Sequence, residues 1–191
     1  MQQGILYESM NMAALWALRV LFVCVNNQYG MGTRVDRATR ITDFGQRAAS
    51  LGLAAEVADG EDVTAVFAAA EKLVAAARGG RPGFLAVSCF RFFGHGRMDK
   101  SPYRSAEEEE AGRKRDPVRR AREGLVESGE SDAATLDALD LDIAREMDAA
   151  IDFAASAAPP AYEALFRDVF APGQPMPEPL RARLDRILAG A

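Results

Sequence analysis

The sequence predicts an α/β fold in which a parallel sheet is followed by a helical C-terminal extension. Three runs, at 20–25, 53–58 and 84–90, predict strands; the first and third have the length and composition of buried strands, and the second is a weaker strand pattern. Segments with apolar residues at helical spacing separate these runs, and strands that alternate with helices form parallel sheets through right-handed crossovers. We therefore expect an α/β domain at 1–105 and a helical extension at 106–191 that packs on it.

The first expected element is an amphipathic helix that begins almost at Met1 and extends to about Leu18, because its apolar residues recur at helical spacing. Neither a strand nor a capping Ser, Thr, Asp or Asn precedes it. In a βαβ protein such a helix normally follows a strand and a turn. The chain is therefore expected to begin inside the fold, without the first strand or strands of the sheet.

Two short segments connect the first predicted strand to the second. A polar, glycine-containing loop at 26–32 follows the first strand directly. Residues 43–51 then show the pattern of a short helix, and Gly52 is expected to close it.

A long helix is expected between the second and third strands. Asp62 is placed to cap its beginning, and Gly79 and Gly80 are placed to end it. Its apolar residues are expected to form one buried face, made of Val63, Val66, Phe67, Ala70, Leu73, Val74 and Ala77.

The C-terminal part is expected to be helical. Asp116 and Pro117 are typical of a helix start, since proline is tolerated in the first turn. Apolar residues at helical spacing predict a long helix over 136–154, which the prolines at 159–160 are expected to stop. A last short helix is expected at 180–188.

The composition is that of an ordinary globular protein, with 49% apolar and 27% charged residues. The formal charge of -5 argues against a nucleic-acid partner, which requires a basic surface. Cys24 and Cys89 lie in apolar runs, so we expect buried, reduced thiols rather than a disulfide. Neither a membrane-spanning run nor a secretory signal is found, so we expect a cytoplasmic protein without a membrane partner.

The loop at 26–32 is the first candidate site, because ligands of open α/β sheets bind just beyond the carboxyl ends of strands. Asn26 and Asn27 offer neutral carboxamide oxygens, which suit a hard cation such as Mg²⁺. Gly30 and Gly32 allow the backbone to approach a phosphate closely. Adjacent asparagines also favour simple turns. The residue pattern alone therefore leaves both interpretations open.

The segment at 91–104 is the second candidate, since its position after a strand puts it on the same rim of the sheet. It contains His95, the only histidine of the chain, on a glycine-flanked loop rather than on an apolar face. Histidine is the usual residue for proton transfer near neutral pH, although a lone histidine is often merely structural or exposed. Arg91 and Arg104 are either solvated surface residues or groups that brace the loop or face an anionic ligand.

Taken together, four segments resemble the alpha subunit of the thiamine-diphosphate-dependent 2-oxo acid dehydrogenases, the first component of pyruvate- and acetoin-dehydrogenase-type complexes. These segments are ESMNMAALW at 8–16, LFVCVNNQYGM at 21–31, VADG at 57–60 and the histidine-bearing loop at 91–104. The match extends to about residue 158. The resemblance implies the thiamine-diphosphate-binding fold, here without its first strand or strands.

The resemblance also implies the cofactors and their ligands. Mg²⁺ is expected to bind the Asn27 side chain and the Tyr29 carbonyl, and to bridge two phosphate oxygens of thiamine diphosphate. His95 is expected beside the thiazolium ring as the catalytic residue, assisting the carbanion intermediate or the acyl transfer. The cofactor-binding residues are then Asn27, Tyr29, Gly30, Met31, Arg91 and His95.

The implied activity is decarboxylation of a 2-oxo acid, or cleavage of acetoin, followed by transfer of the acyl group to a lipoyl carrier. The implied partners are a beta subunit, in a heterotetramer, and a lipoyl-bearing acyltransferase component. Which substrate is used stays open at this point.

The sequence departs from the family in one important respect. Aligning Gly4 with the family places its Gly-Asp-Gly triplet, which supplies a carboxylate to the metal, before Met1. Val25 and Phe93 also stand where many relatives carry Glu and His. Two alternatives therefore remain: a non-catalytic remnant that acts as an assembly subunit, and another α/β enzyme with His95 as its base.

Overall fold

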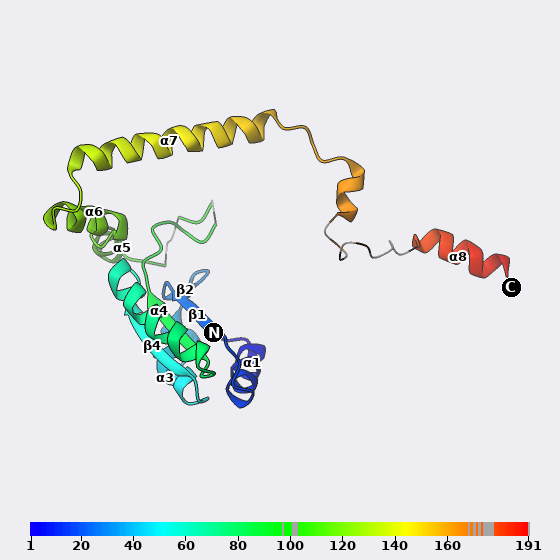
Figure 1. The fold of residues 1–191 in the computed structure, drawn as a ribbon, viewed down its shortest axis with the longest axis horizontal. Coiled ribbons are helices and arrows are strands. Elements are labelled where there is room, and N and C mark those ends of the chain that lie inside the picture. The colour runs from blue at the N-terminus through cyan, green and yellow to red at the C-terminus, as the bar shows by residue number, and fades with distance from the viewer. Residues whose placement is uncertain are drawn as a thin grey trace. The chain divides into compact units, whose positions relative to one another are not determined.

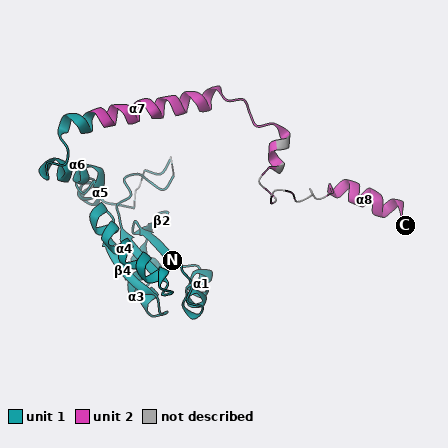
Figure 2. Cartoon of the chain, viewed as in Figure 1, with its two compact units in different colours: residues 1–137 teal, residues 138–191 magenta. Residues whose placement is uncertain are grey.

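The computed structural model shows the helices and strands of Figure 1. The chain divides into two units, residues 1–137 and 138–191 (Figure 2). The first unit includes the helices between residues 106 and 127; the predicted boundary at residue 105 stays a prediction. The structure describes residues 1–96, 98–100, 103–167, 169, 171, 173 and 178–190.

A three-stranded parallel sheet forms the centre of the first unit. Its strands are β1 (Leu21–Asn26), β5 (Gly83–Ser88) and β4 (Ala54–Asp59), with β5 in the middle. Ser88 is in register with both Asn26 and Asp59, so the three strands end at one edge of the sheet. The prediction of an α/β fold with a parallel sheet is confirmed.

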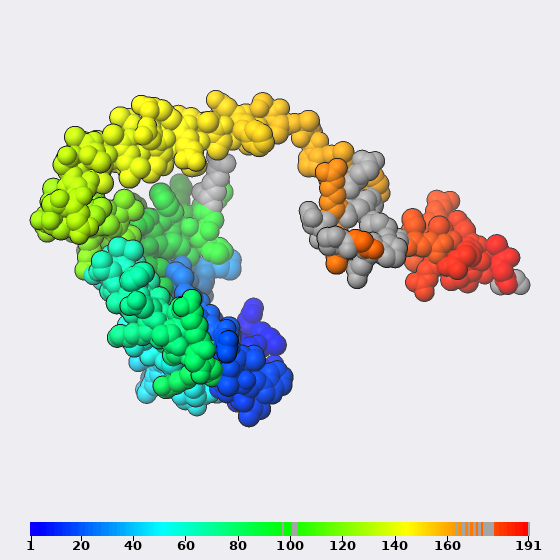
Figure 3. All heavy atoms as spheres, viewed as in Figure 1, coloured from blue at the N-terminus to red at the C-terminus, as the bar shows by residue number. Residues whose placement is uncertain are grey.

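Helices cover both faces of the sheet, as β5 requires, since its residues from Gly83 to Val87 are all buried. On one face, α1 (Gly4–Leu15) and α3 (Phe44–Ala49) pack on the strands. On the other face lies α4 (Val63–Arg78). The atoms of these segments form one continuous packed body (Figure 3).

Aspartate side chains cap α3 and α4 of this unit, and the cap at Asp62 is the predicted one. The Asp43 carboxylate accepts a hydrogen bond from the Gln46 N–H at the start of α3. The Asp62 carboxylate accepts bonds from the Thr64 and Ala65 N–H groups at the start of α4. Each cap satisfies backbone donors that have no partner inside the helix.

The buried face of α4 is narrower than the sequence predicts. Ala69, Leu73 and Ala77 are buried, but Val63 and Phe67 are 66% and 69% exposed. Helix geometry explains this correction, because at 100° per residue Val63 and Phe67 lie to one side of the line through Ala69, Leu73 and Ala77. Apolar character alone therefore overestimated the contact with the sheet.

Several short or polar elements escaped prediction. A two-stranded hairpin, β2 (Tyr29–Gly30) and β3 (Thr33–Arg34), follows β1, and α2 (Val35–Ala38) follows the hairpin. Helix α5 (Ala106–Arg113) occupies the run of glutamates.

The predicted helix at Asp116 is present as α6 (Pro117–Glu127), with the Asp116 side chain as its cap. Cys24 and Cys89 are free, but they are only half-buried rather than fully buried. Burial still raises the pKa of both thiols.

The second unit contains most of the long helix α7 (Ala133–Ser156), a 3₁₀ turn (Tyr162–Phe166) and α8 (Leu180–Ala189). The helices predicted over 136–154 and 180–188 are thus confirmed. Among the described residues, no helix combines the length and the apolar character needed to cross a membrane.

Candidate functional site

The asparagine loop begins where β1 ends. The Asn26 Oδ1 atom accepts a hydrogen bond from the Gln28 N–H, and the Asn27 Oδ1 atom accepts one from the Tyr29 N–H, both at 3.0 Å. Gln28 and Met31 adopt φ angles of 67° and 55°. Such angles are uncommon for residues other than glycine, and backbone strain of this kind clusters at ligand sites.

A pocket of about 350 Å³ opens beside this loop. The lining consists of Asn26, Asn27, Tyr29 and Gly30, together with the residues just before α1 and residues of α2 and α3. The pocket therefore lies beyond the carboxyl end of β1, where the sequence predicts a ligand. Its polar lining includes the carboxamides of Gln2, Asn26, Asn27 and Gln28.

The donors present fit part of a Mg²⁺ site. The Asn27 Oδ1 atom keeps one lone pair after its turn hydrogen bond, and the Tyr29 carbonyl is a second neutral oxygen of the kind that Mg²⁺ binds. The described residues include no group of three His, Cys, Asp or Glu side chains that could hold a metal.

Arg91 ties the histidine loop to the asparagine loop. Its Nη2 group donates to the Met31 carbonyl at 2.9 Å and to the Tyr103 hydroxyl at 2.6 Å. The Tyr103 hydroxyl donates to the Asp99 Oδ2 atom at 2.7 Å, and the His95 N–H donates to the same atom at 2.8 Å. One chain of hydrogen bonds thus runs from the asparagine loop to the backbone of His95.

Arg104 braces the histidine loop from its other end. Its buried guanidinium donates to the Arg91 carbonyl at 2.6 Å and lies 3.6 Å from the Glu109 carboxylate. It also lies 5.1 Å from the centre of the Phe90 ring, a cation–π contact. A desolvated arginine with several fixed partners is a rigid support.

Helix α5 contributes a further contact through Glu108. The Tyr29 hydroxyl donates to the Glu108 carboxylate at 2.9 Å. Burial raises the pKa of Tyr29, and the hydrogen bond to Glu108 raises it further, so the hydroxyl stays protonated as a donor. The rings of Tyr29 and Tyr103 lie 5.4 Å apart between centres.

The structure thus places Asn27, Tyr29 and Gly30 at the pocket, and it joins Met31 to Arg91. His95 lies exposed on the loop that Arg91 anchors. The roles of these residues in binding and catalysis remain predictions.

Three residues of this network carry no clear sequence signal. Asp99 and Glu108 were not recognised, because one lies in a patternless loop and the other in a run of glutamates. No site role was predicted for Tyr103 either, yet its hydroxyl accepts a hydrogen bond from Arg91 and donates one to Asp99. The close approach of Asp99 to Gly94 was also not predictable: a Cβ atom on Gly94 would collide with the Asp99 carbonyl oxygen.

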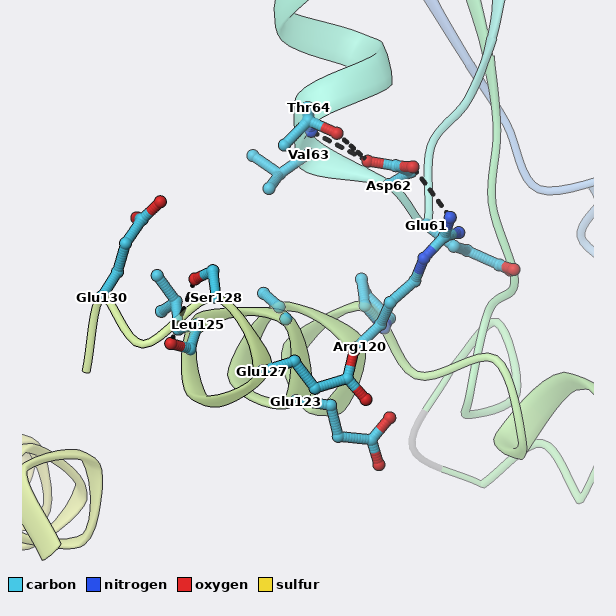
Figure 4. A pocket seen from close by; sticks show the side chains of 13 residues that line it. Glu61, Asp62, Val63, Thr64, Arg120, Glu123, Leu125, Glu127, Ser128 and Glu130 are labelled. Carbon is cyan, nitrogen blue, oxygen red and sulfur yellow. Dashed lines mark hydrogen bonds and ion pairs between the residues drawn. The ribbon is translucent and has the colours of Figure 1, made fainter. Parts of the chain in front are cut away.

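A larger pocket, of about 530 Å³, lies between the start of α4 and α6 (Figure 4). Arg120 spans this junction, with its guanidinium 3.1 Å from the Asp59 carboxylate and 2.8 Å from that of Asp62. Glu61, only 4% exposed, lies 3.2 Å from the Arg115 guanidinium. None of the predicted cofactor residues lines this pocket. We therefore interpret it as the junction that holds α6 on the sheet.

Comparisons with known proteins find related sequences over most of the chain. Residues 1–163 match the family model described as "Dehydrogenase E1 component". The pyruvate dehydrogenase E1 component subunit alpha of Rhizobium meliloti (strain 1021) is 39% identical over 169 residues, which cover 87% of this chain and 49% of that protein. The Zymomonas mobilis protein of the same name is 40% identical over 169 residues, covering 87% of this chain and 48% of that protein.

A mitochondrial relative extends the comparison. The human "Pyruvate dehydrogenase E1 component subunit alpha, somatic form, mitochondrial" is 34% identical over 177 residues, which cover 91% of this chain and 45% of that protein. This chain therefore spans about half the length of the curated relatives that it matches.

Proposed function

Because the chain belongs to the Dehydrogenase E1 component family, we propose that it forms part of the alpha subunit of a thiamine-diphosphate-dependent 2-oxo acid dehydrogenase. The names of the relatives above favour pyruvate as the substrate over branched-chain 2-oxo acids and acetoin. The observation that carries the proposal is the contact between Arg91 and Met31, which joins the two candidate loops at one edge of the sheet.

In this proposal the asparagine loop holds the metal and the phosphates. The Asn27 carboxamide and the Tyr29 carbonyl bind Mg²⁺, while Gly30 and Met31 bring the backbone close to the diphosphate. Thiamine diphosphate, when bound, supplies the electron sink for breaking the C–C bond beside a carbonyl group.

The histidine loop supplies proton transfer. His95 gives or takes a proton near the reacting centre, and its backbone N–H is held by Asp99 at 2.8 Å. Arg91 positions this loop through its hydrogen bonds to Met31 and Tyr103. Preorganisation of this kind matters because small displacements of a catalytic group cost rate.

Two partners follow from the same proposal. A beta subunit completes the cofactor site in a heterotetramer, and a lipoyl-bearing acyltransferase component receives the acyl group. The cytoplasmic location and the absence of a nucleic-acid or membrane partner stay predictions.

A non-catalytic assembly subunit is the second candidate. The observation that favours it is the neutral donor set, because the described residues place no carboxylate cluster at the pocket. Neutral oxygens hold Mg²⁺ less tightly than carboxylates do, so this donor set by itself is expected to bind the metal and the cofactor weakly.

Calorimetry separates the two candidates. The chain is assembled with a beta subunit and titrated with thiamine diphosphate and Mg²⁺. The enzyme proposal expects Mg²⁺-dependent binding, however weak, that Asn27→Ala weakens by about tenfold, or ~1.4 kcal/mol. Asn26→Ala is the matched comparison, because the Asn26 side chain lines the same pocket and makes the equivalent turn hydrogen bond, to the Gln28 N–H, but is not the expected Mg²⁺ ligand. No binding, or equal binding by both variants, would favour the assembly subunit.

A further inference from the structure

Helix α7 carries an apolar stripe that the structure leaves exposed. Leu139, Ile143, Met147 and Ile151 recur every four residues and are between 49% and 60% exposed. No residue of the helix is buried. Helices in proteins gain most of their stability by packing an apolar face, so this stripe requires a cover.

Acidic residues flank the stripe. At 100° per residue, Asp148 and Asp152 lie on one side of it, and Asp142 and Glu146 lie on the other. The helix has a single basic residue, Arg145, whose guanidinium already lies 2.7 Å from the Asp142 carboxylate. A partner that covers this stripe should therefore be apolar with basic flanks.

Helix α8 has that complementary pattern. Leu180, Leu184 and Ile187 lie on one exposed face, with Leu188 beside them. Arg181 and Arg183 flank this face on its two sides. The helix has only ten residues, too few for stability without tertiary contacts. It also lies beyond residue 163, where the match to the family ends.

We propose that α8 packs on the apolar stripe of α7 in the same chain, with the arginines of α8 facing the acidic flanks of α7. The connection at 157–179 permits this, since at its length an extended chain reaches roughly 70 Å and α7 is about 36 Å long. Tethering also raises the effective concentration of α8 to the order of millimolar.

A second copy of α7 is a poor alternative cover. Two such helices would bring acidic flanks together, and like charges across an interface oppose association. The short, basic, apolar α8 avoids that repulsion and buries its own exposed face in the same step. The inference is independent of the proposed function, because neither helix contributes a residue to the candidate site.

Hydrogen exchange of the full chain, followed by mass spectrometry, tests the packing. The α8 amides should be protected in the unmodified chain, and Met147→Asp should speed their exchange by about tenfold. Ala149→Asp places the same charge on the opposite face of α7 and should leave α8 unchanged. Exchange in β5 serves as the control for folding. Unprotected α8 amides, or equal effects of the two variants, would overturn the proposal.

Reversing charges on the two helices tests whether the arginines of α8 face the acidic flanks of α7. Arg181→Glu with Arg183→Glu should speed α8 exchange, and adding Glu146→Lys with Asp148→Lys, one on each flank of the α7 stripe, should restore protection. Failure of this rescue would contradict the proposed pairing. Protection that falls on dilution would contradict packing within one chain and would show that α8 binds a second copy.

Discussion

At the scale of single residues, Asp99 holds the histidine loop in its conformation. One carboxylate oxygen accepts hydrogen bonds from the Tyr103 hydroxyl and the His95 N–H. Charged acceptors make stronger hydrogen bonds than neutral ones. The conformation of the loop therefore depends on a residue that lies four positions after the histidine itself.

Replacing this carboxylate should loosen the loop. Asp99→Ala removes both hydrogen bonds, and losses of this kind cost about 1–3 kcal/mol. Amide exchange of residues 91–96 should become faster, while exchange in β5 should not change. Lys100→Ala, at an exposed neighbour, is the matched control. Unchanged exchange in Asp99→Ala would show that the network does not stabilise the loop.

Glu61 gives a second prediction at this scale, for pH. Burial raises the pKa of Glu61 above its ordinary 4.5, and the nearby Arg115 charge offsets this only in part. The folded protein therefore binds this proton more tightly than the unfolded chain does. The resulting stability is present below pH 4.5 and is lost as the pH rises through the folded-state pKa.

Chemical denaturation at several pH values tests this. Glu61→Gln should remove the part of the stability loss that occurs on raising the pH from 4.5. Glu123→Gln is the control, because its carboxylate is mostly exposed and pairs only with Arg119 of its own helix among the described contacts. Identical pH profiles for wild type and Glu61→Gln would contradict the assignment.

At the scale of elements, apolar patterns predicted the main strands and helices but not their contact faces. β5 is recognisable because both of its faces are buried, which requires an unbroken apolar run. α5 is not, because it docks through Glu108 and Glu109 rather than through an apolar stripe. The hairpin β2–β3 has two residues per strand, too few for periodicity to show.

The same distinction applies to the candidate site. Asn27 and Tyr29 were recognised because they follow a strand in a familiar order. Asp99 and Glu108 were not, since each acquires its role only through contacts formed across the fold. Such contacts join residues that are distant in the sequence, so the local pattern does not predict them.

The corrected face of α4 is testable by mutation. Leu73 is buried in the core, so Leu73→Ala should lower the free energy of unfolding by about 2–5 kcal/mol. Phe67→Ala, on the exposed side, should change it by about 0.5 kcal/mol or less. Denaturant unfolding followed by a probe in residues 1–137 measures both. Equal losses in the free energy of unfolding would show that Phe67 belongs to the buried face of α4, as the sequence predicts.

At the scale of the whole molecule, β1 forms an edge of the sheet that is open to association with other chains. Within the described residues it pairs only with β5, so its other edge is free of strand partners. Val23 and Val25 are 56% and 65% exposed beside that edge. An apolar, unpaired strand edge favours association with other chains.

The isolated chain should therefore self-associate in a way that charge on β1 suppresses. Val23→Lys with Val25→Lys should shift the sedimentation profile toward monomer, because lysines protect strand edges. Val63→Lys, on the exposed side of α4, is the control for added charge alone. A monomeric unmodified chain, or equal effects of both changes, would contradict association through β1.

The central claim is that the asparagine loop and the histidine loop form one cofactor site. Mn²⁺ favours the same oxygen ligands as Mg²⁺ and is the paramagnetic probe, added together with thiamine diphosphate. His95 is the only histidine of the chain, so isotope labelling of histidine in this chain gives a single ring to observe by NMR. We predict that bound Mn²⁺ broadens the His95 ring signals and that Asn27→Ala abolishes the broadening. A sharp His95 signal with Mn²⁺ bound, or broadening that persists without Asn27, would contradict the account.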